Sequence, residues 1–163
     1  MIAYSVTNSP LGYLLVAATE KGVCVVRLGS DKKKLESEFK NEFEMARLMP
    51  HDKYLRKWNQ ALMDYLSGRK SWPLLPYDVR ATAFQKQIWN WLRTIRSGKT
   101  FSYSQAAKAI GRPTAARAVA RACATNPIAL VIPCHRIVPK AGGIGGYRWH
   151  SERKRKLLEL ETV

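Results

Sequence analysis

Two prolines enclose a short segment in which a thiol and an imidazole occupy adjacent positions. The segment spans residues 133–139, PCHRIVP, and follows directly on the apolar run 128–132. Proline fixes its own φ angle and pushes the residue before it towards extended geometry. We therefore expect Cys134 to lie on a stiff, non-helical segment that emerges from the core, a suitable mount for a reactive atom.

The other cysteines and the histidines suggest neither a disulfide framework nor a metal site. The three cysteines stand at positions 24, 123 and 134, and the three histidines at 51, 135 and 150. An odd number of scattered cysteines favours a reducing, cytoplasmic setting. The spacings match no metal-ligand pattern, so we expect no metal and no cofactor. Cys24 falls in a strand-like run, where we expect a buried structural thiol.

The charge is distributed unevenly between the two halves of the chain. The formal net charge is +16, and no Asp or Glu occurs between Asp78 and Glu152. Surfaces that need only solubility mix both signs of charge, so a long acid-free segment indicates a polyanionic partner, first of all DNA. RNA and an acidic membrane surface are alternatives at this level. No run approaches the roughly 18 apolar residues of a membrane span, and residues 1–5 do not resemble a signal peptide.

The first half of the chain has the pattern of a small α/β scaffold. Short runs rich in β-branched residues at 2–7, 13–19 and 23–28 are separated by turn sequences and predict a β-meander. Apolar residues at helical spacing predict helices over 31–45, capped by Asp31, and over 52–66. The proline-rich connector at 71–77 predicts a domain boundary, with domains at 1–76 and 77–163.

The second half has the pattern of a helical domain. We predict helices over 83–95, 102–110, 114–124 and 151–161, the last capped by Ser151. Ser102 and Gln105 form a capping-box signature, and the turn GRP at 111–113 joins two short helices into a helix-turn-helix. The second of these helices, opened by Thr114 or Pro113, is rich in alanine, which suits close helix packing. Arg117 and Arg121 lie one turn apart on it without acidic neighbours, which favours DNA binding.

Cys134 and His135 could form a nucleophile and its base. A thiolate is the reactive form of cysteine, and basic surroundings favour it. Side chains of neighbouring residues on an extended segment point to opposite sides, so His135 would act on the sulfur through a bridging water. Glu152, Glu159, Glu161 or a carboxylate of the first domain would orient the imidazole. The glycine-rich segment 141–147 lacks the features of a phosphate loop; it is either a flexible turn or a close approach to a flat ligand.

Residues 133–138, PCHRIV, resemble the active-site motif of the O6-alkylguanine-DNA alkyltransferases, also called methylated-DNA–protein-cysteine methyltransferases. The resemblance covers the second half of the chain through TAFQ (82–85), GKTFSY (98–103), AARAV (115–119), TNP (125–127), GGY (145–147) and LLELE (157–161). The first half matches in outline only. The resemblance implies an α+β fold: a small ribonuclease-H-like N-terminal domain with an antiparallel sheet and helices, then a mostly helical, winged-helix-like domain carrying the helix-turn-helix.

The resemblance also implies a reaction. The chain would transfer the alkyl group of O6-alkylguanine, or of O4-alkylthymine, from duplex DNA to its own cysteine, once and irreversibly, after base flipping. It would act as a monomer on double-stranded DNA containing alkylated bases. Two alternatives are a DNA-binding damage sensor or regulator without catalysis, which relatives lacking the cysteine exemplify, and a thiol hydrolase.

The roles implied for single residues fall into three groups. The catalytic group comprises Cys134 as acceptor, His135 as base, Glu161 as its orienting carboxylate, Tyr103 as donor to N3 of guanine, and Asn126 as a hinge that bonds the active-site turns. The DNA-binding group comprises Arg117, which would fill the vacated base stack, with Thr114, Ala116 and Arg121. The base pocket comprises Ile137, Gly145, Gly146, Tyr147 and Arg148. Arg148-Trp149 stands where some relatives have Ser-Gly, which affects the size of the pocket, and the ligand set of the structural zinc of some relatives is absent.

Overall fold

The computed structural model describes residues 1–50 and 52–162, which form two compact units. The first unit comprises residues 1–79 together with 127–131, and the second comprises residues 80–126 together with those from 132 onward. His51, one of the three histidines considered for metal binding, lies outside the described residues. Within the described part of the chain, no helix has both the length and the apolar character that crossing a membrane requires.

The first unit is built on a four-stranded sheet. Strands β1 (Ile2–Ser9), β2 (Gly12–Thr19) and β3 (Gly22–Gly29) form the predicted antiparallel meander, and β4 (Leu48–Pro50) adds parallel to β1, so the order is β3-β2-β1-β4. The predicted α+β class is confirmed, and the sheet as a whole is mixed. The sequence pattern did not predict β4, because three residues are too few to establish a period of two.

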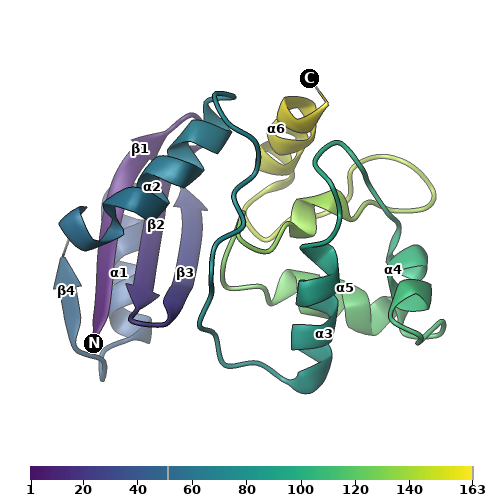
Figure 1. Cartoon of the computed structure of the whole chain (residues 1–163), viewed down its shortest axis with the longest axis horizontal. Helices are drawn as coiled ribbons and strands as arrows, with labels where there is room; N and C mark the ends of the chain where they lie inside the picture. The colour runs from purple at the N-terminus through teal and green to yellow at the C-terminus, as the bar shows by residue number, and fades with distance from the viewer. Residues whose placement is uncertain (51, 163) are drawn as a thin grey trace. The chain divides into compact units, whose positions relative to one another are not determined.

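Two helices pack on the sheet of the first unit. Figure 1 shows α2 (Asp52–Leu66) in front of the sheet and α1 (Lys32–Glu42) behind it. Asp31 caps α1 as predicted, accepting from the backbone N–H of Lys34, although the helix ends three residues before its predicted end. Side chains of the sheet and of α1 form a core cluster: Tyr4, Leu15, Ala17 and Val25 from the strands, and Leu35 and Phe39 from the helix. The buried apolar side chains of α2 are Leu55, Trp58, Leu62, Tyr65 and Leu66, and the side chain of Asp64 is buried as well.

A segment distant in sequence completes the first unit. Ile128 forms a parallel bridge with Val26 of β3, with hydrogen bonds from Val26 N to Pro127 O of 3.1 Å and from Ala129 N to Val26 O of 3.1 Å. Residues 128–132 are fully buried. The apolar run before the Cys-His segment is therefore a core element.

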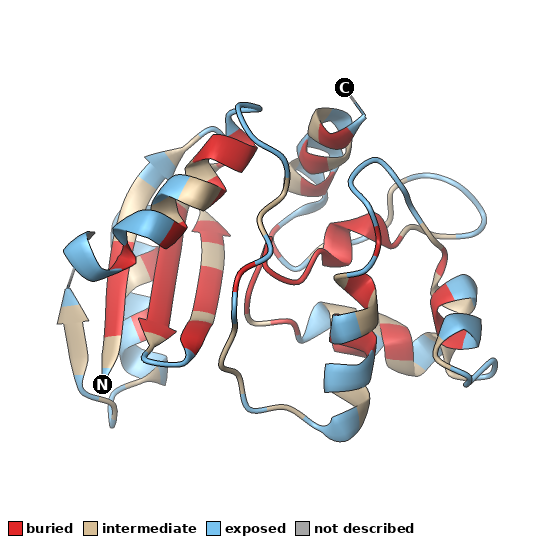
Figure 2. Cartoon of the chain, in the orientation of Figure 1, coloured by how far each residue is buried: buried red, intermediate tan, exposed pale blue. Residues whose placement is uncertain are grey.

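The second unit is helical. It contains α3 (Ala83–Leu92), α4 (Tyr103–Ala109), α5 (Ala116–Ala124), the 3-10 turn η1 (Cys134–Arg136) and α6 (Ser151–Glu161). Figure 2 shows that each of α3, α5 and α6 buries one side and exposes the other. The predicted capping box of α4, formed by Ser102 and Gln105, is present, and α4 packs against α5 as in the predicted helix-turn-helix.

Two predicted helix ends and one predicted cap in the second unit were wrong. Helix α3 ends at Leu92 rather than at residue 95. Helix α5 begins at Ala116, and neither Thr114 nor Pro113 opens it, because the chain continues as a turn to an N-cap at Ala115 without a side-chain cap. Helix α6 has His150 at its N-cap, with φ of 76°, so Ser151 is the first helical residue and not the cap.

Replacing Gly22 by alanine should destabilise the first unit. Gly22 has φ of +156°, and a Cβ atom there would lie 2.8 Å from the carbonyl carbon of Pro76, which is backbone and cannot swing away. At Gly111, φ is +77°, but a Cβ atom there would have no neighbour within 4 Å. We expect Gly22→Ala to lower the free energy of unfolding by roughly 1–3 kcal/mol more than Gly111→Ala does. Urea denaturation followed by tryptophan fluorescence measures both, and equal losses would contradict the steric argument.

Candidate active site

Cys134 lies at the start of a single turn of 3-10 helix. The turn comprises residues 134–136 and is closed by a hydrogen bond from Ile137 N to Cys134 O of 3.2 Å. The prediction of a non-helical segment was therefore wrong at this point. Pro133 is compatible with the turn because it occupies the N-cap, where no backbone N–H is needed. Phe101 holds the far side, donating to Arg136 O at 3.0 Å and accepting from Val138 N at 2.9 Å.

Cys134 lines a cavity of about 330 Å³. Two helices, the turn η1 and the glycine-rich segment supply its lining: Tyr103, Ala120, Cys123, Ala124, Cys134, Gly146, Tyr147 and Arg148. The structure thus brings together five of the residues predicted for catalysis or for the base pocket. Ile137 and Gly145 are not among the described lining residues. Ile137 is fully buried, and Gly145 lies so close to Pro139 that a Cβ atom would clash with its ring.

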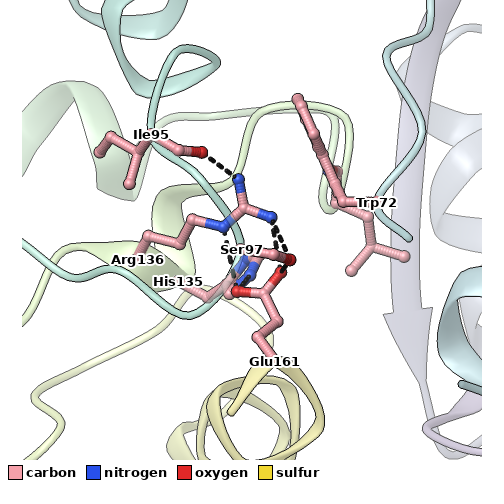
Figure 3. A network of polar contacts seen from close by, with 7 residues as sticks. Trp72, Ile95, Ser97, His135, Arg136 and Glu161 are labelled. Carbon is pink, nitrogen blue, oxygen red and sulfur yellow. Dashed lines mark hydrogen bonds and ion pairs between the residues drawn. The ribbon is translucent and has the colours of Figure 1, made fainter. Parts of the chain in front are cut away.

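A buried network joins His135 to Glu161 (Figure 3). His135 Nε2 lies 3.0 Å from Glu161 Oε1, and Arg136 donates from Nε to Oε1 at 3.0 Å and from Nη2 to Oε2 at 2.6 Å. The three side chains are at most 1% exposed. Ser97 donates to Glu161 Oε2 at 2.9 Å, and Ile95 accepts from Arg136 Nη1 at 2.6 Å. The network connects η1, the end of α6 and the loop after α3.

Of the carboxylates considered as partners of His135, only Glu161 has this position among the described residues. Glu152 and Glu159 both pair with Arg155 on the exposed face of α6. The bond to a carboxylate assigns the tautomer of His135, because Nε2 must carry the proton that it donates. Nδ1 is then an acceptor; it is buried and has no hydrogen-bond partner among the described residues. Burial lowers the pKa of His135, which keeps the imidazole neutral and available as a base at neutral pH.

The environment of Cys134 keeps its thiol protonated. Burial raises the pKa of Cys134 well above its usual value, and interaction with the Cys123 thiol raises it further. Asn126, whose Nδ2 donates to Cys134 Sγ at 3.3 Å and to Ile132 O at 3.1 Å, acts in the opposite direction, as does the charge of Lys154. A resting thiol of this kind needs a base at the moment of reaction.

The residues predicted to contact DNA lie on or just before α5. Arg117 and Arg121 are exposed on the helix, Ala116 is half-buried at its first position, and Thr114 is exposed in the preceding turn. Val119 and Ala122, on the other side of the helix, are buried. The face that carries the two arginines is therefore open to a partner.

Sequence reasoning missed the cavity residues Ala120, Cys123 and Ala124, Ser97 of the network, and two buried basic residues. Arg136 is fully buried. The sequence held a signal for its ion pair, because a buried arginine needs a carboxylate partner and this half of the chain has few. Lys154 is 1% exposed and donates from Nζ to Ile137 O at 2.6 Å and to Gly146 O at 3.1 Å, so it ties the glycine-rich segment to η1. The run RKRK at 153–156 reads as a solvated basic face and gave no such signal.

Replacing Glu161 by glutamine should be strongly destabilising. The change leaves the buried guanidinium of Arg136 without a counter-charge, which typically costs about 3–5 kcal/mol of unfolding free energy. Glu159→Gln is the matched control, because Glu159 is 62% exposed and its surface pair with Arg155 is worth about 0–1 kcal/mol. Urea unfolding of both variants at neutral pH measures the difference. Similar small losses would mean that Arg136 does not depend on this carboxylate.

Comparison with known proteins gives matches over nearly the whole chain. Residues 2–76 match the family described as 6-O-methylguanine DNA methyltransferase, ribonuclease-like domain, and residues 83–163 match 6-O-methylguanine DNA methyltransferase, DNA binding domain. The Methanosarcina acetivorans methylated-DNA–protein-cysteine methyltransferase is 36% identical, and the alignment covers 97% of each chain. The Escherichia coli bifunctional transcriptional activator/DNA repair enzyme Ada is 44% identical, with 99% of this chain and 46% of Ada covered. The chain therefore spans less than half the length of Ada.

Solved structures agree with these matches. The crystal structure of Mycobacterium tuberculosis O6-methylguanine methyltransferase superimposes with a TM-score of 0.84 at 34% identity, covering 99% of this chain and 93% of the other. A structure of the M. tuberculosis protein in complex with DNA gives the same TM-score at 33% identity, covering 98% and 92%. The similarity thus includes both units of the fold.

Proposed function

Because the chain belongs to the 6-O-methylguanine DNA methyltransferase family, we propose that it repairs DNA by direct reversal, taking the alkyl group of O6-alkylguanine onto Cys134. The observation that carries the proposal is the position of this cysteine. It lines a cavity that also contains the Tyr103 phenol, and the next residue in the chain holds a carboxylate-bound imidazole. A nucleophile, a base and a proton donor are thus gathered in one unit of the fold.

The proposed relay moves the thiol proton to His135. The unpaired Nδ1 atom would accept it through one bridging water, while Glu161 stabilises the imidazolium that forms. The Cys134 thiolate then attacks the carbon bonded to O6 of guanine. A carbon–sulfur bond forms as the carbon–oxygen bond breaks, and the electron pair stays on the purine.

Tyr103 would stabilise the departing purine. Burial raises the pKa of Tyr103, so its phenol keeps its proton and can donate to N3 of guanine, where negative charge develops. The product is a thioether without a good leaving group, so each molecule would react once. The same chemistry would extend to O4-alkylthymine, whose reactive carbon is also bonded to an exocyclic oxygen.

The target carbon is inaccessible in a stacked duplex, so the nucleotide must be flipped into the cavity. We propose that α5 enters the minor groove, where Arg117 fills the vacated stack and Arg121, Thr114 and Ala116 contact the backbone. Small side chains on this helix, such as Ala116 and Ala120, permit close approach. The acid-free segment between Asp78 and Glu152 supports double-stranded DNA with alkylated bases as the partner, and we propose a cytoplasmic monomer as the acting form.

The proposed division of labour follows the location of the site. All residues of the cavity and of the Arg136–Glu161 network lie between Ile95 and Glu161. We propose that residues 77–163 are the DNA-binding and transfer domain and that residues 1–76 are a scaffold.

Intact-protein mass spectrometry tests the proposed function. We expect a duplex containing O6-methylguanine to add one methyl group per protein molecule, on the peptide that contains Cys134, with restored guanine in the DNA. Cys134→Ala should gain no mass, and Cys24→Ala, which changes a half-buried cysteine of the sheet, should react as the native chain does. Binding to the damaged duplex without any mass change would instead identify a non-catalytic damage sensor.

A second experiment separates base flipping from chemistry. Arg117→Ala should slow methyl transfer from duplex DNA roughly tenfold to hundredfold, because flipping a base costs a few kcal/mol. Its reaction with the free base O6-methylguanine should be unchanged. Lys86→Ala removes an exposed charge from α3 of the same unit and is the control. Equal losses with duplex and free base would reject the flipping role of Arg117.

A further inference from the structure

The cavity contains a second thiol that alkyl transfer does not use. Cys123 lies on α5 and lines the cavity together with Cys134, and both cysteines are free. Cys123 is half-buried, whereas Cys134 is 5% exposed. Its helical neighbours on the cavity wall, Ala120 and Ala124, have short side chains. A small ligand that enters the cavity therefore meets two cysteines.

The two thiols are close enough to affect each other and the same neighbours. A direct interaction with Cys123 is one cause of the raised pKa of Cys134, second only to burial. Both thiols also act on the pKa of the Tyr103 phenol and on that of the Lys154 ammonium group. The charge of this ammonium group acts on Cys134 against the larger effect of burial, in the direction of the deprotonated, ligand-forming state.

Two sulfur donors limit the kinds of ligand that Cys123 and Cys134 can bind together. Structural zinc takes four protein ligands, and no group of three or more His, Cys, Asp and Glu side chains suited to a metal occurs in residues 1–50 and 52–162. A disulfide requires the sulfurs to approach to a bonded distance of about 2 Å and requires an oxidant. A sulfur-seeking atom that lies between the two sulfurs and bonds to both needs neither a sulfur–sulfur bond nor an oxidant. Trivalent arsenic that carries one organic substituent can form two bonds to sulfur.

We propose that Cys123 and Cys134 together form a binding site for monosubstituted trivalent arsenic compounds, which occupy the cavity and block the acceptor sulfur. With phenylarsine oxide the reaction consumes both thiols. Two arsenic–sulfur bonds form, the arsenic–oxygen double bond breaks, and the two thiol protons leave with the oxygen as one water molecule. No oxidant or reductant takes part, and arsenic stays trivalent.

The test is stoichiometric binding of phenylarsine oxide to the full chain, followed by intact mass and peptide mapping. We expect one equivalent to bind, with a mass gain of one phenylarsine oxide less one water, and a cross-link between the peptides of Cys123 and Cys134. An excess of the monothiol 2-mercaptoethanol should leave the adduct in place, whereas the dithiol 2,3-dimercaptopropanol should remove it. Binding is read from mass, so the result does not depend on whether the chain transfers alkyl groups.

Variants identify the pair. Cys123→Ser and Cys134→Ser should each bind phenylarsine oxide roughly a hundredfold more weakly, because the second attachment is no longer intramolecular. Their adducts should be released by the monothiol. Cys24→Ser, which changes the third free cysteine, should bind as the native chain does, and thermal unfolding verifies that each variant is folded. Native-like binding by Cys123→Ser, or release from the native chain by the monothiol, would overturn the proposal.

Discussion

The active site depends on one buried ion pair. Taking the Arg136 guanidinium and the Glu161 carboxylate out of water costs several kcal/mol for each ion, and attraction between them offsets this only with good geometry and further hydrogen bonds. Both conditions are met, because the contact is bidentate and Ser97 and Ile95 satisfy remaining groups. The same carboxylate binds the imidazole of His135 and so fixes which nitrogen carries its proton. Glu161 therefore both neutralises the buried charge of Arg136 and sets the tautomer of His135.

The surroundings of Cys134 make its sulfur less reactive than an exposed thiolate would be. A thiolate exposed in a basic protein would react with many electrophiles, but burial holds Cys134 in the thiol form. Asn126 and Lys154 oppose this effect only in part, and both also bond backbone carbonyls near the cavity. The two side chains that lower the pKa of the Cys134 thiol thus also hold the backbone near the cavity. A change to either would alter geometry and reactivity together.

Sequence reasoning succeeded where a local pattern has a local cause. The meander strands, the Asp31 cap and the Ser102–Gln105 capping box each follow from a few neighbouring residues and are present. Glu161 was one of only three candidate partners for His135 from the second half of the chain, although a carboxylate of the first domain was left open as well. What could not be predicted depends on contacts distant in sequence. The pairing of β4 with β1, the burial of Lys154 and the turn geometry at Cys134 are decided by elements that local periodicity does not reveal.

The assignment of residues 127–131 to the sheet unit has a consequence for modularity. Four of these residues, 128–131, are fully buried, and they hydrogen-bond to β3, although the chain on either side belongs to the helical unit. No single cut separates the two units, since a fragment beginning after the connector would carry residues 128–131 without the β3 strand to which they hydrogen-bond. Exchange of parts between relatives by recombination would be costly for the same reason. Substitutions in β3 and in residues 128–131 are therefore expected to be constrained by each other.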